Sequence, residues 1–168
     1  KNASGRFIAF LDSDDRWTAD KLEKQISFMT KNNFPLSYTD YWITDSTGKI
    51  QRKRGIPKKI NYSKLLKTNY IGCLTAVYDS HILGKQYMPL IKKRQDYGLW
   101  LKILKLTRFA YGLDEPLAFY RVHKGSLSAN KLDAAKYTWK LYRNVEKLNI
   151  IKSAYYFMNY SIRGILRS

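Results

Sequence analysis

Cysteine and histidine are scarce in this sequence, which has one Cys and two His among 168 residues. The single thiol, Cys73, excludes a disulfide framework and a cysteine-based zinc site, and it is typical of a reducing compartment. Two histidines exclude a histidine-rich metal site.

Long apolar runs, glycine-rich loops and internal repeats are also missing. No apolar run approaches the roughly 20 residues that span a bilayer, so we expect a soluble or peripheral chain. Neither a glycine-rich phosphate loop nor a dinucleotide fingerprint is present. The hydrophobic content of 45%, with 15% aromatic residues, nevertheless predicts a packed core in one domain of ordinary size.

Acidic residues are few, with 13 Asp and Glu against 31 Lys and Arg, which gives a net charge of +18. Such a charge predicts attraction to an anion. Nucleotide diphosphates, an acidic acceptor, an anionic membrane face and nucleic acid all remain candidates.

Three of the few acids gather directly after one short apolar run. Residues 7–11 read FIAFL, which predicts a strand buried on both faces, and Asp12, Asp14 and Asp15 follow it. Clustered carboxylates repel one another, and a hard divalent cation such as Mg2+ or Mn2+ neutralises them. Alternatively, the three acids are turn formers and helix caps before the next helix.

The remaining pattern mixes strands and helices, so the predicted fold class is α/β. Leu22, Ile26 and Met29 predict the apolar face of a helix over 19–31. The other expected elements are a strand at 36–44 with a hairpin partner at 49–54, a helix at 61–68, strands at 73–78, 109–113 and 117–122 with a turn at 114–116, and helices from 130 onward.

The string GRFIAFLDSDDRWTADKL resembles the Asp-x-Asp segment of the inverting glycosyltransferase family 2, which has the GT-A fold. By this resemblance Asp14 holds the metal on the donor diphosphate. Asp12 faces the ribose or assists the metal, and Asp15 supports both. The resemblance implies Mg2+ or Mn2+ as cofactor and a mixed sheet with flanking helices.

The string KKRQDYGLWLKILKL also resembles the family, which has its catalytic base in such a segment. By this match Asp96 is the base, although Gln95 departs from the commoner Glu. Tyr97 and Trp100 are candidates for a stacking wall beside the acceptor. From local pattern alone, Asp96 is equally well a helix cap, and Trp100 packs on a helix face.

Two further segments are matched to the site by the resemblance. Gly72 and Cys73 would line the acceptor side, although strand packing explains Cys73 as well. Arg121 and His123 alternate in an extended YRVHKGSLS segment and would hold the diphosphate or metal. A histidine at the end of a strand is otherwise more often structural.

The resemblance also divides the chain. Residues 1–129 correspond to the C-terminal portion of a GT-A domain without its nucleotide-binding half, so the isolated fragment is expected to be inactive. Residues 130–168 form a basic, aromatic helical extension. Its aromatic residues suit either a membrane interface or packing against the rest of the protein.

The predicted function is therefore an inverting transfer of a sugar from a nucleotide-diphosphate sugar to a hydroxyl on a glycan or lipid-linked acceptor. The family implies a role in bacterial polysaccharide, lipopolysaccharide or capsule synthesis. It also implies a cytoplasmic location, with the inner face of the membrane as a peripheral site. The alternative is a non-enzymatic basic module that binds nucleic acid or an anionic membrane. No specific nucleic acid is expected, because no known recognition motif is present.

Overall fold

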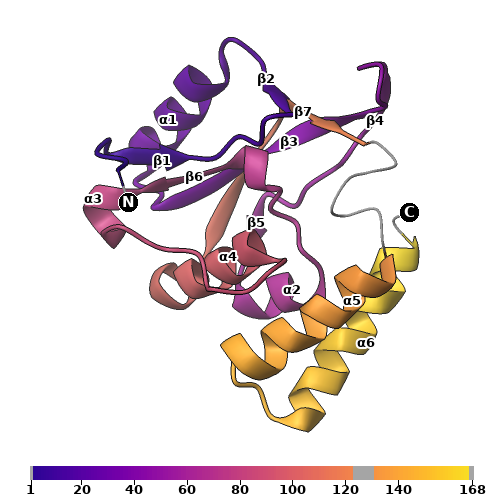
Figure 1. Ribbon diagram of the computed structural model, residues 1–168. Helices are drawn as coiled ribbons and strands as arrows, with labels where there is room; N and C mark the ends of the chain where they lie inside the picture. The colour runs from indigo at the N-terminus through magenta and orange to yellow at the C-terminus, as the bar shows by residue number, and fades with distance from the viewer. Residues whose placement is uncertain (1, 123–130, 167–168) are drawn as a thin grey trace.

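A single mixed sheet organises the protein, and helices cover it on two sides (Figure 1). The computed structural model describes residues 2–122 and 131–166. The strands are β1 (Phe7–Ala9), β2 (Arg16–Trp17), β3 (Leu36–Thr44), β4 (Ile50–Lys53), β5 (Lys59–Ile60), β6 (Ala76–Asp79) and β7 (Ala110–Arg121). The α-helices are α1 (Lys21–Asn32), α2 (Tyr62–Lys67), α3 (Ser80–Leu83), α4 (Gln95–Thr107), α5 (Lys131–Lys140) and α6 (Ile150–Leu166).

The strands follow the order β1-β6-β3-β7-β2, with β4 paired to β3 and β5 paired to β7. Only the pairing of β3 with β7 is parallel among the described strands. Helix α1 lies on one side of the sheet, and α2, α4, α5 and α6 gather on the other (Figure 1). The α/β class and the mixed sheet with flanking helices are confirmed.

Strand β1 differs from its prediction as a strand buried on both faces. It spans only three residues, all of them half-buried, and Leu11 beyond it is 48% exposed. Among the described strands β1 pairs with β6 alone, at the end of the sheet. An apolar run therefore does not distinguish an edge strand from a central one.

Strand β7 runs without interruption through the predicted turn at 114–116. The prediction of two strands was wrong, because an irregularity in the register accommodates Pro116 where it lies opposite Asp40. A proline has no backbone N–H to donate, and a bulge removes the need for that hydrogen bond. The segment predicted as a strand at 73–78 begins instead with a 3-10 turn at Cys73–Thr75, and β6 follows.

Helix α1 begins at Lys21, and its predicted apolar face was partly wrong. Lys21, Gln25 and Met29 are buried, whereas Leu22 is exposed. Lys21 Nζ donates to Gln25 Oε1 at 2.7 Å, and Gln25 Nε2 lies 2.9 Å from the Thr75 carbonyl oxygen. Polar groups that satisfy one another can thus occupy positions that a hydrophobic pattern assigns to solvent.

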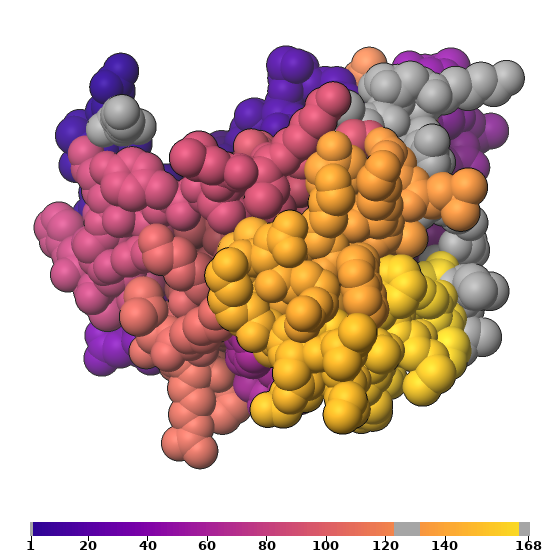
Figure 2. Space-filling view, turned by 60° about the horizontal axis from the view of Figure 1, so that its bottom comes forward, coloured from indigo at the N-terminus to yellow at the C-terminus, as the bar shows by residue number. Residues whose placement is uncertain are grey.

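The C-terminal helices share the main core. Leu141 and Tyr142, in a π-helical turn at Leu141–Val145 after α5, are fully buried in the same cluster as α2 and α4. Tyr142 donates to the Leu66 carbonyl at 2.5 Å. In Figure 2 these helices, orange and yellow, cover much of the face turned forward. No helix in the described ranges is long and apolar enough to cross a membrane.

Candidate active site

The three clustered acids lie on a tight turn that follows β1. The Asp15 N–H donates to the Asp12 carbonyl at 3.2 Å, so these residues are turn formers, as one interpretation of the sequence holds. The turn leaves Asp12 and Asp14 exposed and buries Asp15. It therefore presents two carboxylates to solvent and uses the third within the protein.

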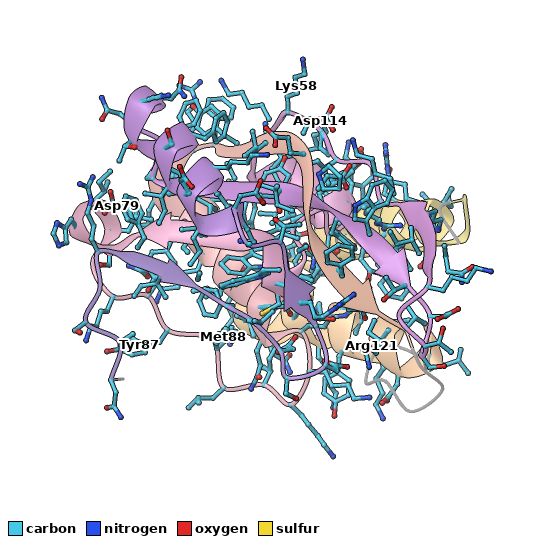
Figure 3. All side chains as sticks on the ribbon, turned by 90° about the horizontal axis from the view of Figure 1, so that it is seen from above. Lys58, Asp79, Tyr87, Met88, Asp114 and Arg121 are labelled. Atoms are coloured by element: carbon cyan, nitrogen blue, oxygen red, sulfur yellow. The ribbon has the colours of Figure 1, made fainter. Side chains whose placement is uncertain are left out.

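Asp15 fixes this turn to the end of β7. Its Oδ1 accepts the backbone N–H of Arg121 at 3.0 Å, and Figure 3 shows Arg121 near the end of that strand. Burial raises the pKa of Asp15 to about 6; the Arg121 N–H opposes the shift, and the charges of Asp14 and Asp12 add to it. Asp15 thus positions its two neighbours.

The segment 72–75 lies beside the strand that follows the acid turn. Trp17 Nε1 donates to the Leu74 carbonyl at 2.7 Å, which holds this segment against the strand that follows the acid turn. Burial raises the pKa of the Cys73 thiol to about 12, and Asp96, Asp12 and Asp15 contribute in that order. A thiol with this pKa stays protonated at neutral pH, so Cys73 is no thiolate nucleophile.

Asp96 lies in the first turn of α4 and is half-buried. Burial raises its pKa, the Tyr97 N–H and the Arg94 charge lower it, and the Asp12 carboxylate raises it. A carboxylate with a raised pKa is a stronger base. Arg94 precedes the helix in a left-handed conformation, and its guanidinium donates to the Tyr160 hydroxyl of α6 at 2.7 Å.

Four segments distant in sequence therefore meet in one place: the acid turn, 72–75, 94–96 and the end of β7. Asp96, Asp12 and Asp15 all raise the pKa of Cys73, and Asp12 also raises the pKa of Asp96, so Asp12 and Cys73 lie within electrostatic reach of Asp96. Asp14 is on the same turn as Asp12. Its position directly across from Asp96 stays a prediction.

Tyr97 and Trp100 lie in the core below this site. Both are fully buried. The Tyr97 hydroxyl is 2.9 Å from the Leu65 carbonyl, and the Trp100 ring meets Phe10 edge-on at 5.4 Å. Their burial favours the packing interpretation over a stacking wall for a sugar.

The remaining candidates are placed as follows. Gln95 is exposed at the first residue of α4, beside Asp96. The Gly72 carbonyl accepts both the N–H and the hydroxyl of Thr75, which shapes the turn that carries Cys73. His123 lies outside the described residues.

Two cavities in the described structure are lined by other residues. One, of about 230 Å3, lies between the N-terminal segment and the loop before α4, and its lining includes Phe10, Tyr87 and Met88. Figure 2 shows the molecular outline notched between the indigo N-terminal residues and the pink segment, and Figure 3 labels Tyr87 and Met88 on that loop. The other, of about 250 Å3, lies at α2 and α6. Neither includes an acid of the cluster.

The carboxylates suit a magnesium-like ion that arrives with a phosphate ligand. In the described part of the chain, no group of three or more His, Cys, Asp or Glu could hold a metal by itself. However, Mg2+ is commonly bound by one or two carboxylates together with substrate phosphates. The exposed Asp12 and Asp14 offer that number.

Sequence reasoning missed Lys21 and Arg94. Lys21 is fully buried with its ammonium 4.4 Å from the centre of the Trp17 ring, below the strand that follows the acid turn. Burial lowers the pKa of Lys21 to about 8. A lysine at the first position of an amphipathic helix gives no sequence signal of this kind.

The burial of Lys21 predicts an unusual pH dependence of stability. Its folded pKa is near 8 and its unfolded pKa near 10.5, so the unfolded chain binds more protons between these values. The contribution of Lys21 to the free energy of unfolding should therefore rise with pH over this window, by on the order of 3 kcal/mol. We expect Lys21→Met to lose this rise in urea unfolding measured at several pH values. Above pH 10.5 the variant should be less stable than the wild type, because Gln25 Oε1 loses its donor, whereas below pH 8 removal of the buried charge opposes this loss.

The exposed Lys31 of the same helix supplies the control. Lys31→Met should retain the rise between pH 8 and pH 10.5. Equal slopes in the wild type and in Lys21→Met would show that Lys21 is charged in the fold.

Comparison with known proteins agrees with the fold. The model of "Glycosyl transferase family 2" matches residues 1–85. An uncharacterized glycosyltransferase of Haemophilus influenzae is 34% identical over 99% of this chain and 67% of its own length. The chain belongs to glycosyltransferase family 2.

Other relatives of this family 2 chain have more specific names. A "Putative teichuronic acid biosynthesis glycosyltransferase TuaG" of Bacillus subtilis is 42% identical, and the match covers 98% of this chain and 66% of the relative. A "UDP-Glc:alpha-D-GlcNAc-diphosphoundecaprenol beta-1,3-glucosyltransferase WfgD" of Escherichia coli is 44% identical, with 98% and 64% covered. The family 2 chain thus spans slightly less than two thirds of both.

Solved structures show the same fold at low identity. The crystal structure of S. aureus TarS 1-349 in complex with UDP-GlcNAc matches with a TM-score of 0.59 and 16% identity, over 84% of this chain and 44% of that chain of residues 1-349. The GT-A architecture predicted from the Asp-x-Asp resemblance is thereby confirmed for this family 2 chain.

Proposed function

We propose that this protein is an inverting glycosyltransferase that moves a sugar from a nucleotide-diphosphate sugar to a hydroxyl acceptor. The observation that carries the proposal is the electrostatic proximity of Asp12, on the acid turn, to Asp96, in a helix far along the chain, with Cys73 within reach of both. Family membership supports the same class of reaction.

Asp96 is the proposed catalytic base. It removes the proton from the acceptor hydroxyl as that oxygen attacks the anomeric carbon from the side opposite the departing diphosphate. Burial and the Asp12 carboxylate both raise the pKa of Asp96, which strengthens it as a base. Attack from the opposite side inverts the anomeric configuration.

The acid turn is the proposed site of the donor diphosphate. Asp14 and Asp12 would hold Mg2+ or Mn2+, which supplies positive charge to neutralise the departing diphosphate. Asp15 holds the turn in place through the Arg121 N–H. The Arg121 guanidinium, which lowers the pKa of Asp15, would supply a second positive charge near the donor diphosphate.

The acceptor is proposed to be a glycan or lipid-linked sugar of a bacterial surface polysaccharide, lipopolysaccharide or capsule. Two relatives support this, since their names specify teichuronic acid and a diphosphoundecaprenol substrate. Gln95, Gly72 and Cys73 line the proposed acceptor side. The division into a catalytic portion, 1–129, and a helical extension, 130–168, is part of the same proposal, as are a cytoplasmic location and the inactivity of the isolated fragment.

A transfer assay tests the proposal. The natural polypeptide that contains this sequence is incubated with a panel of nucleotide sugars, Mn2+ or Mg2+ and a hydroxyl acceptor. We expect acceptor-dependent release of nucleotide diphosphate, with inversion of the anomeric configuration seen by NMR. Retained configuration would contradict Asp96 as base.

The basic binding module remains the second candidate because of the net charge of +18. It predicts strongly salt-dependent affinity for generic DNA or RNA together with no metal-dependent binding of any nucleotide sugar. That combination would replace the enzymatic proposal.

A further inference from the structure

Helix α6 has apolar residues on two sides. The inner side includes Tyr156, Phe157 and Tyr160, which pack against the core. On the outer side, a row of large hydrophobic residues is between 47% and 78% exposed: Ile151, Tyr155, Met158 and Ile162. These four are spaced by four, three and four residues, so they form one line along the helix. We call this row the α6 stripe.

A basic pocket lies beside the stripe. It has a volume of about 250 Å3 and is lined by Asn61, Ser63, Lys64, Lys67, Tyr70 and Arg163. Within the described residues, Lys64, Lys67 and Arg163 form no ion pair with a carboxylate, whereas Lys24, Lys53, Lys93 and Lys105 do. The pocket therefore has three cations and no acid in its lining.

The stripe and the basic pocket form one continuous surface. Lys67 Nζ lies 5.3 Å from the centre of the Tyr155 ring, and Arg163 directly follows Ile162. Tyr70 in the pocket is three residues before Cys73 at the acid site. Three residues reach at most about 11 Å between Cα atoms, so the pocket opens close to the proposed active site.

We propose that this surface docks onto a lipid bilayer that contains anionic phospholipid. The α6 stripe enters the interface, and the basic pocket takes the phosphate of a lipid headgroup. Apolar and aromatic residues in a row, flanked by Lys and Arg, are typical of helices that lie in a membrane interface. The charge of +18 is complementary to an anionic leaflet. This inference rests on the proposed function only where it implies that docking brings the active site to a lipid-linked acceptor.

Vesicle sedimentation tests the docking. The natural polypeptide is mixed with phosphatidylcholine vesicles, with or without phosphatidylglycerol. We expect binding to the anionic vesicles. The variant Lys64→Ala/Lys67→Ala/Arg163→Ala should bind them on the order of 100-fold more weakly, since each cation near the surface contributes about a factor of five. Ile151→Ser/Met158→Ser should also weaken binding, and this loss should persist at high salt.

A matched control has the same net charge as the pocket variant. Lys31, Lys49 and Lys102 are exposed and lie outside the pocket lining, and replacing all three by Ala should change binding only slightly. If this control loses as much vesicle affinity as the pocket variant does, the binding depends only on general charge attraction, and the basic pocket is not a specific lipid site.

Three other outcomes would also overturn the proposal. Met158 could be protected from hydroxyl radicals without vesicles, which would show that protein covers the stripe. A dimer that Met158→Ser dissociates would assign the stripe to a second copy. Displacement from vesicles by inorganic diphosphate, with no effect of the stripe variant, would make the pocket a site for free phosphate.

Failure of docking is distinguishable from failure of the proposed chemistry. Asp96→Asn should bind vesicles as well as the wild type does. The stripe variant should retain transfer to a water-soluble acceptor, whereas its transfer to an acceptor embedded in vesicles should fall with its vesicle affinity.

Discussion

Replacing Asp96 by Asn should lower kcat by about 1,000-fold or more and leave the affinity for the donor nearly unchanged. A positioned general base contributes about 100-fold to 10,000-fold to a rate. An amide of nearly the same shape cannot accept the proton. In the proposed mechanism Asp96 acts on the acceptor, so its loss should affect the chemical step and spare binding of the diphosphate. Steady-state transfer kinetics and calorimetric titration with nucleotide diphosphate and Mn2+ measure the two effects.

The pH profile gives the same prediction an independent readout. The base must be ionised, and burial raises the pKa of Asp96. As the pH is lowered, the wild-type enzyme should therefore lose activity at a higher pH than an ordinary Asp would give. Glu23→Gln, on the exposed side of α1, removes one carboxylate elsewhere and should leave rate and profile unchanged. Full turnover in Asp96→Asn would eliminate Asp96 as base.

Replacing Asp14 by Asn should abolish the dependence of donor binding on metal and lower kcat/KM by about 100-fold or more. Asp14 is exposed on the acid turn, where Asp15 fixes the backbone. An amide oxygen is a much poorer ligand for a hard cation than a carboxylate. Titration with a nucleotide diphosphate, with and without Mn2+, measures the loss directly.

The two substitutions should differ in their effect on binding. Asp96→Asn should retain metal-dependent donor binding and Asp14→Asn should lose it, while both lose transfer. If Asp14→Asn binds the donor with wild-type metal dependence, the metal must be held elsewhere, and Asp12 becomes the residue to test.

Sequence patterns predicted those parts of the fold that depend on local chemistry. The bounds of β3 agree with the strand predicted at 36–44, and α2 lies within the helix predicted at 61–68. The first turn of α4 contains Asp96, as the amphipathic pattern indicated. The β3 segment has the aromatic and β-branched composition of a strand, Asn61 caps the start of α2, and the apolar residues of α4 recur at helical spacing.

The failures all involve partners from elsewhere in the chain. The exposure of Leu11 depends on the place of β1 in the sheet, and Pro116 stays in a strand because β3 offers an irregular register. Lys21 is buried because Gln25 Oε1 accepts a hydrogen bond from its ammonium group, and Gln25 is in turn held by Ser37 and the Thr75 carbonyl from other elements. For the site, the sequence offered the acids, but the approach of Asp12 to Asp96 depends on tertiary packing.

The hydrogen bond between Arg94 and Tyr160 links the C-terminal helices to the segment that carries the proposed base. Helix α6 restrains the guanidinium that lowers the pKa of Asp96, so these helices influence the ionisation of that carboxyl group. A hybrid enzyme that received α5 and α6 from another family member would be expected to inherit a new optimum pH along with its new tail.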